Sequence, residues 1–223
     1  ECQRAVESAI ALGYRHIDTA EMYGNEDAVG AAVAATGGRA EIQITTKVWN
    51  DHLAPDDLRR AAEASLARLG TSYIDLYLIH WPHPQMNLRA TLETMMDLQR
   101  DGCVRAIGVA NFPVALLRQA VEEIGAPIAC NQVEYHVLLG QSAVLSFARR
   151  HGIVLTAYSP LAKGRLDHYP EIAAIARKHA ATVPQIALAW LFDQDGVAAI
   201  PKSSRAEGQR ENLAALDIHL DDE

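Results

Sequence analysis

The chain has 223 residues, of which 49% are hydrophobic, and its formal net charge is −8. This length and apolar content suit one α/β domain with a large core and exclude a disordered chain. The negative charge, without a compensating basic stripe, excludes nucleic acid as an expected partner, and no run of about 18 apolar residues is present to span a membrane.

Helical periodicity and short apolar runs alternate along the chain, and glycine or proline marks most of the boundaries between them. Strands are predicted, in chain order, at Arg15–Thr19, Ile42–Val48, Ile74–Ile79, Ala106–Ala110, Ile128–Glu134, Ile153–Tyr158 and Val197–Ile200. Helices are predicted at Gln3–Leu12, Glu26–Ala35, Pro55–Leu69, Leu88–Arg100, Val114–Ile124, Ser142–Arg150, two segments after Pro170 that divide near Pro184, and Glu207–Leu216.

A helix between successive strands leaves room only for crossover connections, so the predicted sheet is parallel. No G-x-G-x-x-G sequence follows a strand, which argues against a Rossmann fold. The pattern instead favours a (β/α)8 TIM barrel formed by residues 1–223 as a single domain. Because the chain starts at Glu1 inside a predicted helix, we expect the first barrel strand to be missing and the domain to be incomplete at both ends.

Ionisable side chains follow three successive predicted strands. Asp18 lies near the end of the first strand with Tyr23 on the following loop, Lys47 lies near the end of the second, and His80 follows the third. Taken singly, Tyr23 could be a loop aromatic, Asp18 and Lys47 a structural ion pair, and His80 a core histidine. Together at one end of a barrel they favour a proton-transfer site, because a phenol with a pKa near 10 becomes an effective acid only beside a cation.

The chain resembles the aldo-keto reductases along essentially its whole length. The first matching segment runs from Gly13 through Ala20, Asn25 and Glu26 to Val29 and Gly30. Further matches are Ile44–Lys47, Leu78–Pro82, Ile107–Val109, Asn131–Glu134 and Ile200–Ser203. The resemblance implies that Tyr23 is the general acid and that Lys47 lowers its pKa. It further implies that Asp18 pairs with Lys47 and that His80 positions the substrate carbonyl.

The resemblance also implies an extended nicotinamide cofactor without a Rossmann fingerprint. Asn111 and Gln132 would hold its carboxamide, and the ring of Tyr158 would stack on its nicotinamide. The alternative for Asn111 is a helix N-cap ahead of Pro113. Ala110 stands where the family usually has serine, so one carboxamide hydrogen bond, worth about 0.5–1.5 kcal/mol, is expected to be absent.

Residues near the carboxyl end match the part of the family that holds the adenosine phosphate. Lys202, Ser203 and Arg205 fall at the phosphate-binding positions, and Glu211 and Asn212 match the adenine-contacting pair. Many family members carry a further arginine where this chain has Gly208. Arg205 could still bind a ribose 2′-phosphate, so NADPH is the expected cofactor and NADH the alternative. A solvated basic loop is the other interpretation of Arg205.

The sequence therefore predicts a monomeric, cytoplasmic, NADPH-dependent carbonyl reductase. Its loops most resemble bacterial 2,5-diketo-D-gluconate reductases, whose relatives reduce methylglyoxal and other small aldehydes or ketones. Trp49 and Trp81 are predicted to line the substrate pocket. No metal site is inferred at His80 and His83, because the neighbouring prolines oppose a shared helical face. Two alternatives are a regulatory cofactor-binding protein on the same barrel and a phosphate-binding hydrolase or isomerase.

Overall fold

The computed structural model describes residues 1–221 of the chain. Its strands are β1 (His16–Asp18), β2 (Gln43–Val48), β3 (Ile74–Ile79), β4 (Val104–Ala110), β5 (Ile128–Glu134), β6 (Val154–Tyr158) and β7 (Val197–Ala199). They follow one another in sequence order, and the pairings of β1 with β2, β2 with β3, β3 with β4, and β6 with β7 are parallel. Because a helix separates each strand from the next, this is the topology of a (β/α)8 barrel, of which the described residues hold seven strands. The predicted fold class is confirmed.

The helices begin and end close to the predicted residues. They are α1 (Cys2–Leu12), α2 (Glu26–Ala35), α3 (Pro55–Leu69), α4 (Leu88–Arg100), α5 (Val114–Arg118), α6 (Ser142–Arg150), α7 (Pro170–Lys178), α8 (Val183–Phe192) and α9 (Ala206–Ala214). Helix α3 shows why the boundaries were predictable. Pro55 occupies its first turn with Asp56 and Asp57, where negative charge is favourable, and Gly70 ends it in the left-handed conformation at φ 63°.

The helix predicted at Val114–Ile124 differs from the observed one. Helix α5 ends at Arg118, and the chain continues as a wider π turn over Gln119–Glu123, in which the Ile124 amide donates to the Gln119 carbonyl. Gly125 then adopts a φ of 77°, and the Ala126 amide reaches the Ala120 carbonyl. The helical prediction was therefore correct in extent, but hydrophobic periodicity did not reveal the change in winding.

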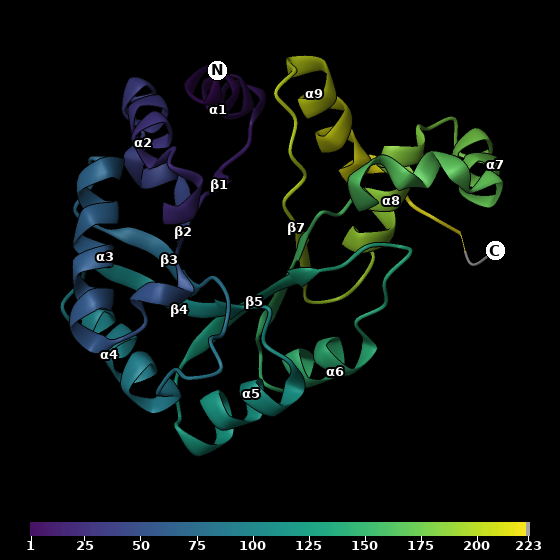
Figure 1. Cartoon of the computed structure of the whole chain (residues 1–223). Coiled ribbons are helices and arrows are strands. Elements are labelled where there is room, and N and C mark those ends of the chain that lie inside the picture. Colours follow the sequence, from purple (N-terminus) through teal and green to yellow (C-terminus); the bar gives the residue numbers. More distant parts are fainter. Residues whose placement is uncertain (222–223) are drawn as a thin grey trace. The chain divides into compact units, whose positions relative to one another are not determined.

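The chain forms two compact units, the amino-terminal unit over Glu1–Asn131 and the carboxy-terminal unit from Gln132 onward. The single barrel domain over residues 1–223 stays a prediction. In the amino-terminal unit, α2, α3 and α4 pack side by side along one face of the strands (Figure 1). The pairing register places Ile44, Ile79 and Ile107 on one face of β2, β3 and β4, and all three are fully buried. Lys47 lies on the opposite face of β2, which alternates with the face of Ile44.

The carboxy-terminal unit has its own apolar cluster. Buried side chains of β5, β6, α6 and α8 form it, namely Val133, Tyr135, Leu145, Leu155, Ala157 and Leu191. Helix α8 begins with a capping box, in which the Thr182 hydroxyl accepts from the Gln185 amide and the Gln185 side chain accepts from the Thr182 amide. This cap explains why the two helical segments after Pro170 divide at the predicted place.

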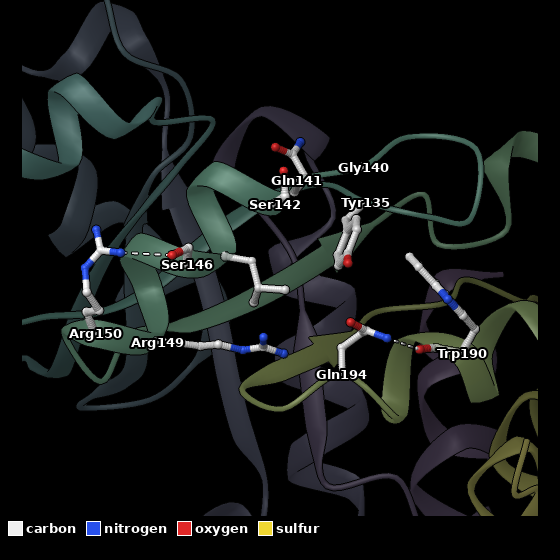
Figure 2. A pocket seen from close by; sticks show the side chains of 10 residues that line it. Tyr135, Gly140, Gln141, Ser142, Ser146, Arg149, Arg150, Trp190 and Gln194 are labelled. Carbon is white, nitrogen blue, oxygen red and sulfur yellow. Dashed lines mark hydrogen bonds between the residues drawn. The ribbon is translucent and has the colours of Figure 1, made fainter. Parts of the chain in front are cut away.

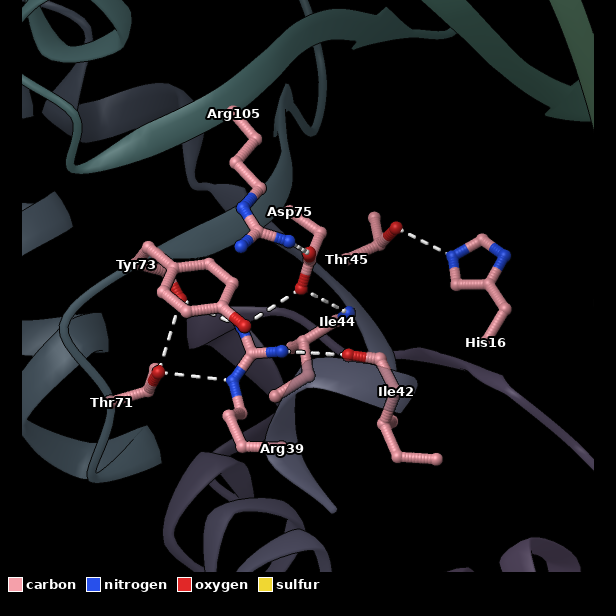
Figure 3. Close-up of polar contacts among 9 residues, drawn as sticks. All are labelled: His16, Arg39, Ile42, Ile44, Thr45, Thr71, Tyr73, Asp75 and Arg105. Atoms are coloured by element: carbon pink, nitrogen blue, oxygen red, sulfur yellow. Dashed lines mark hydrogen bonds and ion pairs between the residues drawn. The ribbon is translucent and has the colours of Figure 1, made fainter.

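A polar cluster joins the amino-terminal ends of β2, β3 and β4 (Figure 3). Asp75 accepts from Arg39 at 2.8 Å, from Arg105 at 3.0 Å and from the Ile44 amide at 3.0 Å. Both guanidinium groups also lie over the ring of Tyr73, at 4.0 Å and 3.8 Å from its centroid. These contacts connect neighbouring strands at the end opposite to Lys47 and leave the other end available for ligand chemistry.

None of the helices that the structure describes is both long and apolar enough to cross a membrane.

Candidate active site

Four predicted side chains meet at the carboxyl ends of β1, β2 and β3. Asp18 is the last residue of β1, Lys47 is the residue before the last of β2, and His80 directly follows β3. The register pairs Asp18 with Thr45 and Lys47 with Leu78, so these side chains and that of His80 share one face of the sheet. Tyr23 ends the 3₁₀ turn η1 (Glu21–Tyr23), which follows β1 directly. The structure thus brings together the four residues that were predicted from the sequence to form the site.

A buried ion pair forms the base of this cluster. The ammonium of Lys47 lies 2.5 Å from a carboxylate oxygen of Asp18 and donates to the Thr19 carbonyl at 2.8 Å. The Lys47 side chain is fully buried and that of Asp18 is 9% exposed. The same ammonium lies 5.2 Å from the ring centroid of Tyr23, whose side chain is half exposed. A fixed positive charge therefore faces a phenol that solvent or a ligand can reach.

His80 lies against two aromatic rings. It makes edge contacts with Tyr23 at a centroid distance of 5.5 Å and with Trp49 at 5.2 Å. Burial, followed by the positive charge of Lys47, lowers the pKa of His80 from 6.5 to about 4, although the charge of Asp18 opposes the shift. His80 is therefore neutral near pH 7. Among the described residues, none is hydrogen-bonded to its Nδ1 atom.

The two predicted pocket tryptophans differ in their surroundings. The indole of Trp49 packs edge-on against His80, whereas Trp81 follows His80 in sequence and is 42% exposed. Trp49 is thus held by its neighbours beside the ion pair. Trp81 presents an apolar surface to solvent that a substrate could cover.

Asn111 also lies in the amino-terminal unit, directly after β4. It has a positive φ of 62°, and its side-chain amide donates to the backbone carbonyl of His80 at 3.0 Å. The N-cap alternative for Asn111 is wrong, because Pro113 is the residue that precedes α5. Ala110, at the end of β4, is buried and has no hydroxyl to offer a cofactor.

The other predicted cofactor residues belong to the carboxy-terminal unit. Gln132 is buried in β5, and Tyr158 ends β6, where burial raises the pKa of its phenol. Lys202 and Arg205 are exposed on the segment between β7 and α9. Amide, aromatic and cationic groups of these types suit a carboxamide, a nicotinamide ring and a phosphate, so the residues fit a dinucleotide in their chemistry.

Ser203 organises the loop before α9. Its hydroxyl accepts from the Arg205 amide at 3.2 Å and lies 3.0 Å from the Arg205 carbonyl. A Cβ atom at Gly208 would lie only 2.6 Å from this hydroxyl oxygen, which gives a packing reason for glycine at that position. The arginine that many relatives carry there would require the Ser203 side chain to move.

The predicted adenine-contacting pair has structural contacts of its own. The Glu211 carboxylate accepts from the Thr182 hydroxyl at 2.5 Å, and its backbone carbonyl accepts from Gln185 at 3.2 Å. Asn212 is buried. Glu211 therefore links α9 to the capping box of α8, and an adenine contact at this residue stays a prediction.

Two acidic residues near the ion pair received no role from the sequence. Glu26 is fully buried in α2, where it accepts from the Thr46 hydroxyl at 2.5 Å and from Arg68 at 2.6 Å. Glu21 opens the turn that carries Tyr23, and its carboxylate accepts from the backbone amide of Trp49. Glutamate at a turn or helix start usually indicates a solvated surface, so nothing in the sequence marked either contact.

A pocket of about 470 Å³ lies elsewhere, within the carboxy-terminal unit (Figure 2). Its lining includes Tyr135, Leu145, Arg149, Trp190 and Gln194. None of the site residues predicted from the sequence lines it. This pocket therefore provides no test of the predicted carbonyl site.

Comparison with known proteins gives a consistent result over the whole chain. The model of the aldo/keto reductase family matches residues 1–223. The methylglyoxal reductase DkgB of Salmonella typhi is 42% identical over 223 residues, which cover 98% of this chain and 83% of the relative. A solved structure assigned as a 2,5-diketo-D-gluconic acid reductase B has a TM-score of 0.95 at 37% identity, covering 100% of this chain and 80% of the other. An aldo-keto reductase from Klebsiella pneumoniae, solved in complex with NADPH, has a TM-score of 0.90 at 37% identity, covering 99% and 82%. The chain thus belongs to the aldo/keto reductase family and is an oxidoreductase.

Proposed function

We propose that this protein reduces small aldehydes, ketones or keto sugar acids with NADPH, and that Tyr23 is the general acid. The observation that carries the proposal is the position of the Lys47 ammonium. It lies 2.5 Å from a carboxylate oxygen of Asp18, and it lies 5.2 Å from the ring centroid of Tyr23. A buried cation beside a reachable phenol favours the phenolate that remains after proton donation. Asp18 holds the side chain of Lys47 in this position.

His80 is proposed to orient the substrate. A neutral imidazole donates one N–H, and a substrate carbonyl oxygen between His80 and Tyr23 could accept from both side chains. Tyr23 then transfers its proton to that oxygen as the carbonyl becomes an alcohol. Bound NADPH supplies the hydride that reaches the carbonyl carbon. The protein's share of the reaction is thus the placement of the oxygen and the delivery of one proton.

The proposed cofactor contacts are those that the family resemblance implies. Asn111 and Gln132 hold the carboxamide, Tyr158 stacks on the nicotinamide, and Glu211 and Asn212 contact the adenine. Lys202, Ser203 and Arg205 bind the phosphate groups. The exposed guanidinium of Arg205 suits a 2′-phosphate, and the Klebsiella pneumoniae relative solved with NADPH supports this choice over NADH.

The proposed substrates follow from the relatives and from the pocket wall. The relatives include a methylglyoxal reductase and a structure assigned as a diketogluconic acid reductase, so compact polar carbonyl compounds are the first class to test. Trp49 and Trp81 are proposed to line the site and to exclude water from the reacting carbonyl. We further propose that the enzyme acts as a monomer in the cytoplasm.

Substitution Tyr23→Phe tests the proposal directly. It removes the proposed proton donor and leaves the proposed cofactor contacts in place, so we expect turnover to fall about 10²–10⁴-fold while the Kd for NADPH stays within about threefold. Tyr73→Phe is the matched control, because it removes a phenol at the opposite end of β3 and should leave turnover within about twofold. Substantial reduction of methylglyoxal by the Tyr23 variant would contradict the assignment. NADPH binding without turnover in the unaltered protein would favour a regulatory role.

A further inference from the structure

Glu21 connects two segments that carry proposed site residues. It is the first residue of η1, which ends at Tyr23, and its carboxylate extends to the segment that leaves β2. One carboxylate oxygen accepts from the backbone amide of Trp49 and lies 3.1 Å from Nδ1 of His52. The side chain of Glu21 is only 9% exposed, whereas that of His52 is 51% exposed. The contact with Trp49 is therefore the sheltered one.

The Trp49 amide lies where the β2 ladder stops. Trp49 follows the last residue of β2 and precedes the 3₁₀ turn η3 (Asn50–His52), so neither the strand nor the turn provides its amide with an acceptor. A carboxylate acceptor makes a charge-assisted hydrogen bond, which is stronger and more directional than a bond to water. Glu21 thus fixes the backbone of Trp49 at the point where its side chain leaves the sheet.

Four residues, including His80, are linked in a closed circuit. The Tyr23 ring packs on His80, the His80 ring packs on Trp49, and the Trp49 backbone bonds to Glu21, two residues before Tyr23. Three of the four links are side-chain packing or adjacency along the chain. The remaining link, the hydrogen bond from Trp49 to Glu21, can be removed by substituting Glu21, which leaves Tyr23, Trp49 and His80 unaltered.

We propose that Glu21 is a positioning residue, which holds the Tyr23 turn and the Trp49 segment in register around His80. This inference rests on the function proposed above. Loss of the link would let Tyr23 and Trp49 move independently, and a displacement of about 1 Å at a reacting group can reduce the rate about 10²-fold. Among the described residues, the carboxylate of Glu21 is hydrogen-bonded to the Trp49 amide and lies near His52.

Three substitutions separate the hydrogen bond from the other features of Glu21. Glu21→Ala removes the acceptor, and we expect kcat to fall at least about tenfold, with the Kd for NADPH within about twofold. Glu21→Gln keeps a side-chain oxygen that can accept from Trp49, so kcat should stay within about threefold of the unaltered enzyme. His52→Ala removes only the exposed partner and should change kcat by less than about twofold.

A second readout does not depend on turnover. Hydrogen exchange of the Trp49 backbone amide, followed by NMR, should be faster in Glu21→Ala and close to normal in Glu21→Gln. If Glu21→Ala is too unstable to assay, Glu21→Asp, which shortens the carboxylate by one methylene, should show the same loss of kcat and of protection. A merely structural role would lower the melting temperature of the variants and leave kcat per folded molecule unchanged.

The outcomes distinguish this inference from the function on which it rests. If Tyr23→Phe is inactive and Glu21→Ala retains normal kcat, the positioning role is overturned and the proposed function stands. If the kcat of Glu21→Gln is as low as that of Glu21→Ala, the hydrogen bond to Trp49 does not explain the loss of kcat and the inference fails. The same conclusion follows if His52→Ala lowers kcat as much as Glu21→Ala does. If the unaltered protein reduces no carbonyl compound, the proposed function fails, while loss of Trp49 protection in Glu21→Ala would still support the contact.

Discussion

The cations proposed to act in the amino-terminal and carboxy-terminal units lie in opposite environments. In the first, Lys47 is fully buried and bonded to Asp18 and to a backbone carbonyl. In the second, Lys202 and Arg205 lie exposed on the segment between β7 and α9. The electrostatic interaction of a charge with a reacting group is stronger where water is excluded and the charge is held in place. A charge that binds a phosphate from solvent can stay hydrated until the ligand arrives. Substitution of the buried charged pair should therefore alter stability, and substitution of the exposed cations should alter binding.

The largest effect on stability is expected from Asp18→Asn. The substitution leaves the buried ammonium of Lys47 without a counter-charge, and breaking a buried pair from one side typically costs about 3–5 kcal/mol. Urea unfolding would measure the loss. Adding Lys47→Met to the Asp18 variant should restore part of the stability, because the unpaired charge is then absent.

An exposed pair in the same unit provides the control. Asp57 and Arg60 form an ion pair within α3, with both side chains largely exposed. Asp57→Asn should change the free energy of unfolding by about 0.5 kcal/mol or less. Equal losses for Asp18→Asn and Asp57→Asn would mean that burial does not determine how much the Asp18–Lys47 ion pair contributes to stability.

The low pKa of His80 predicts a pH-dependent stability. Unfolded His80 binds a proton below pH 6.5, whereas the folded residue does so only below about pH 4. Between these values the unfolded state holds more protons, so the free energy of unfolding should fall as the pH is lowered from 6.5 towards 4. At 1.36 kcal/mol per pKa unit, the difference between the two pKa values corresponds to about 3 kcal/mol. In His80→Gln this part of the pH dependence should be lost, and parallel curves for the two proteins would show that His80 is not the group responsible.

Two glycines test how rigidly each unit is packed. A Cβ atom at Gly30 in α2 would lie 2.3 Å from the backbone oxygen of Leu69, so α2 and α3 would have to separate. We expect Gly30→Ala to cost about 1–3 kcal/mol. At Gly208 in α9 the obstacle is the Ser203 hydroxyl, which can rotate, and alanine also favours a helix. Gly208→Ala should therefore stay within about 0.5 kcal/mol of zero, as thermal melts of both variants would show.

Most of the fold could be predicted because the local signals agree with one another. Helix α3 has proline at its start and a left-handed glycine at its end, and its predicted bounds match those observed. Asp18, Lys47 and His80 were found because each comes at the end of a strand, where parallel strands meet. The π turn after Arg118 was missed, because an i to i−5 bond leaves no mark on hydrophobic periodicity.

The contacts that the sequence did not indicate are those that join distant segments through one atom. The bond from the Trp49 amide to Glu21 depends on how two turns meet, and no spacing rule encodes it. Glu211, which the resemblance places at an adenine contact, also accepts a hydrogen bond from Thr182, and the sequence did not indicate this link between α9 and the start of α8. Gly208 was identified as a departure from the family, but the packing of Ser203 that accompanies it required coordinates.

The most selective expected effect concerns the exposed loop of the carboxy-terminal unit. Arg205→Ala should weaken NADPH binding about tenfold, or about 1.4 kcal/mol, and leave NADH within about twofold, because only NADPH carries the 2′-phosphate. Arg205 makes no side-chain cap on α9, so the helix should be unaffected. Arg210→Ala, an exposed arginine on the same helix, is the control and should change neither Kd. Fluorescence titrations at low salt would give both constants. An equal loss for the two cofactors would mean that Arg205 does not bind the 2′-phosphate. Lys202 would then be the exposed cation to compare with the buried charge of Lys47.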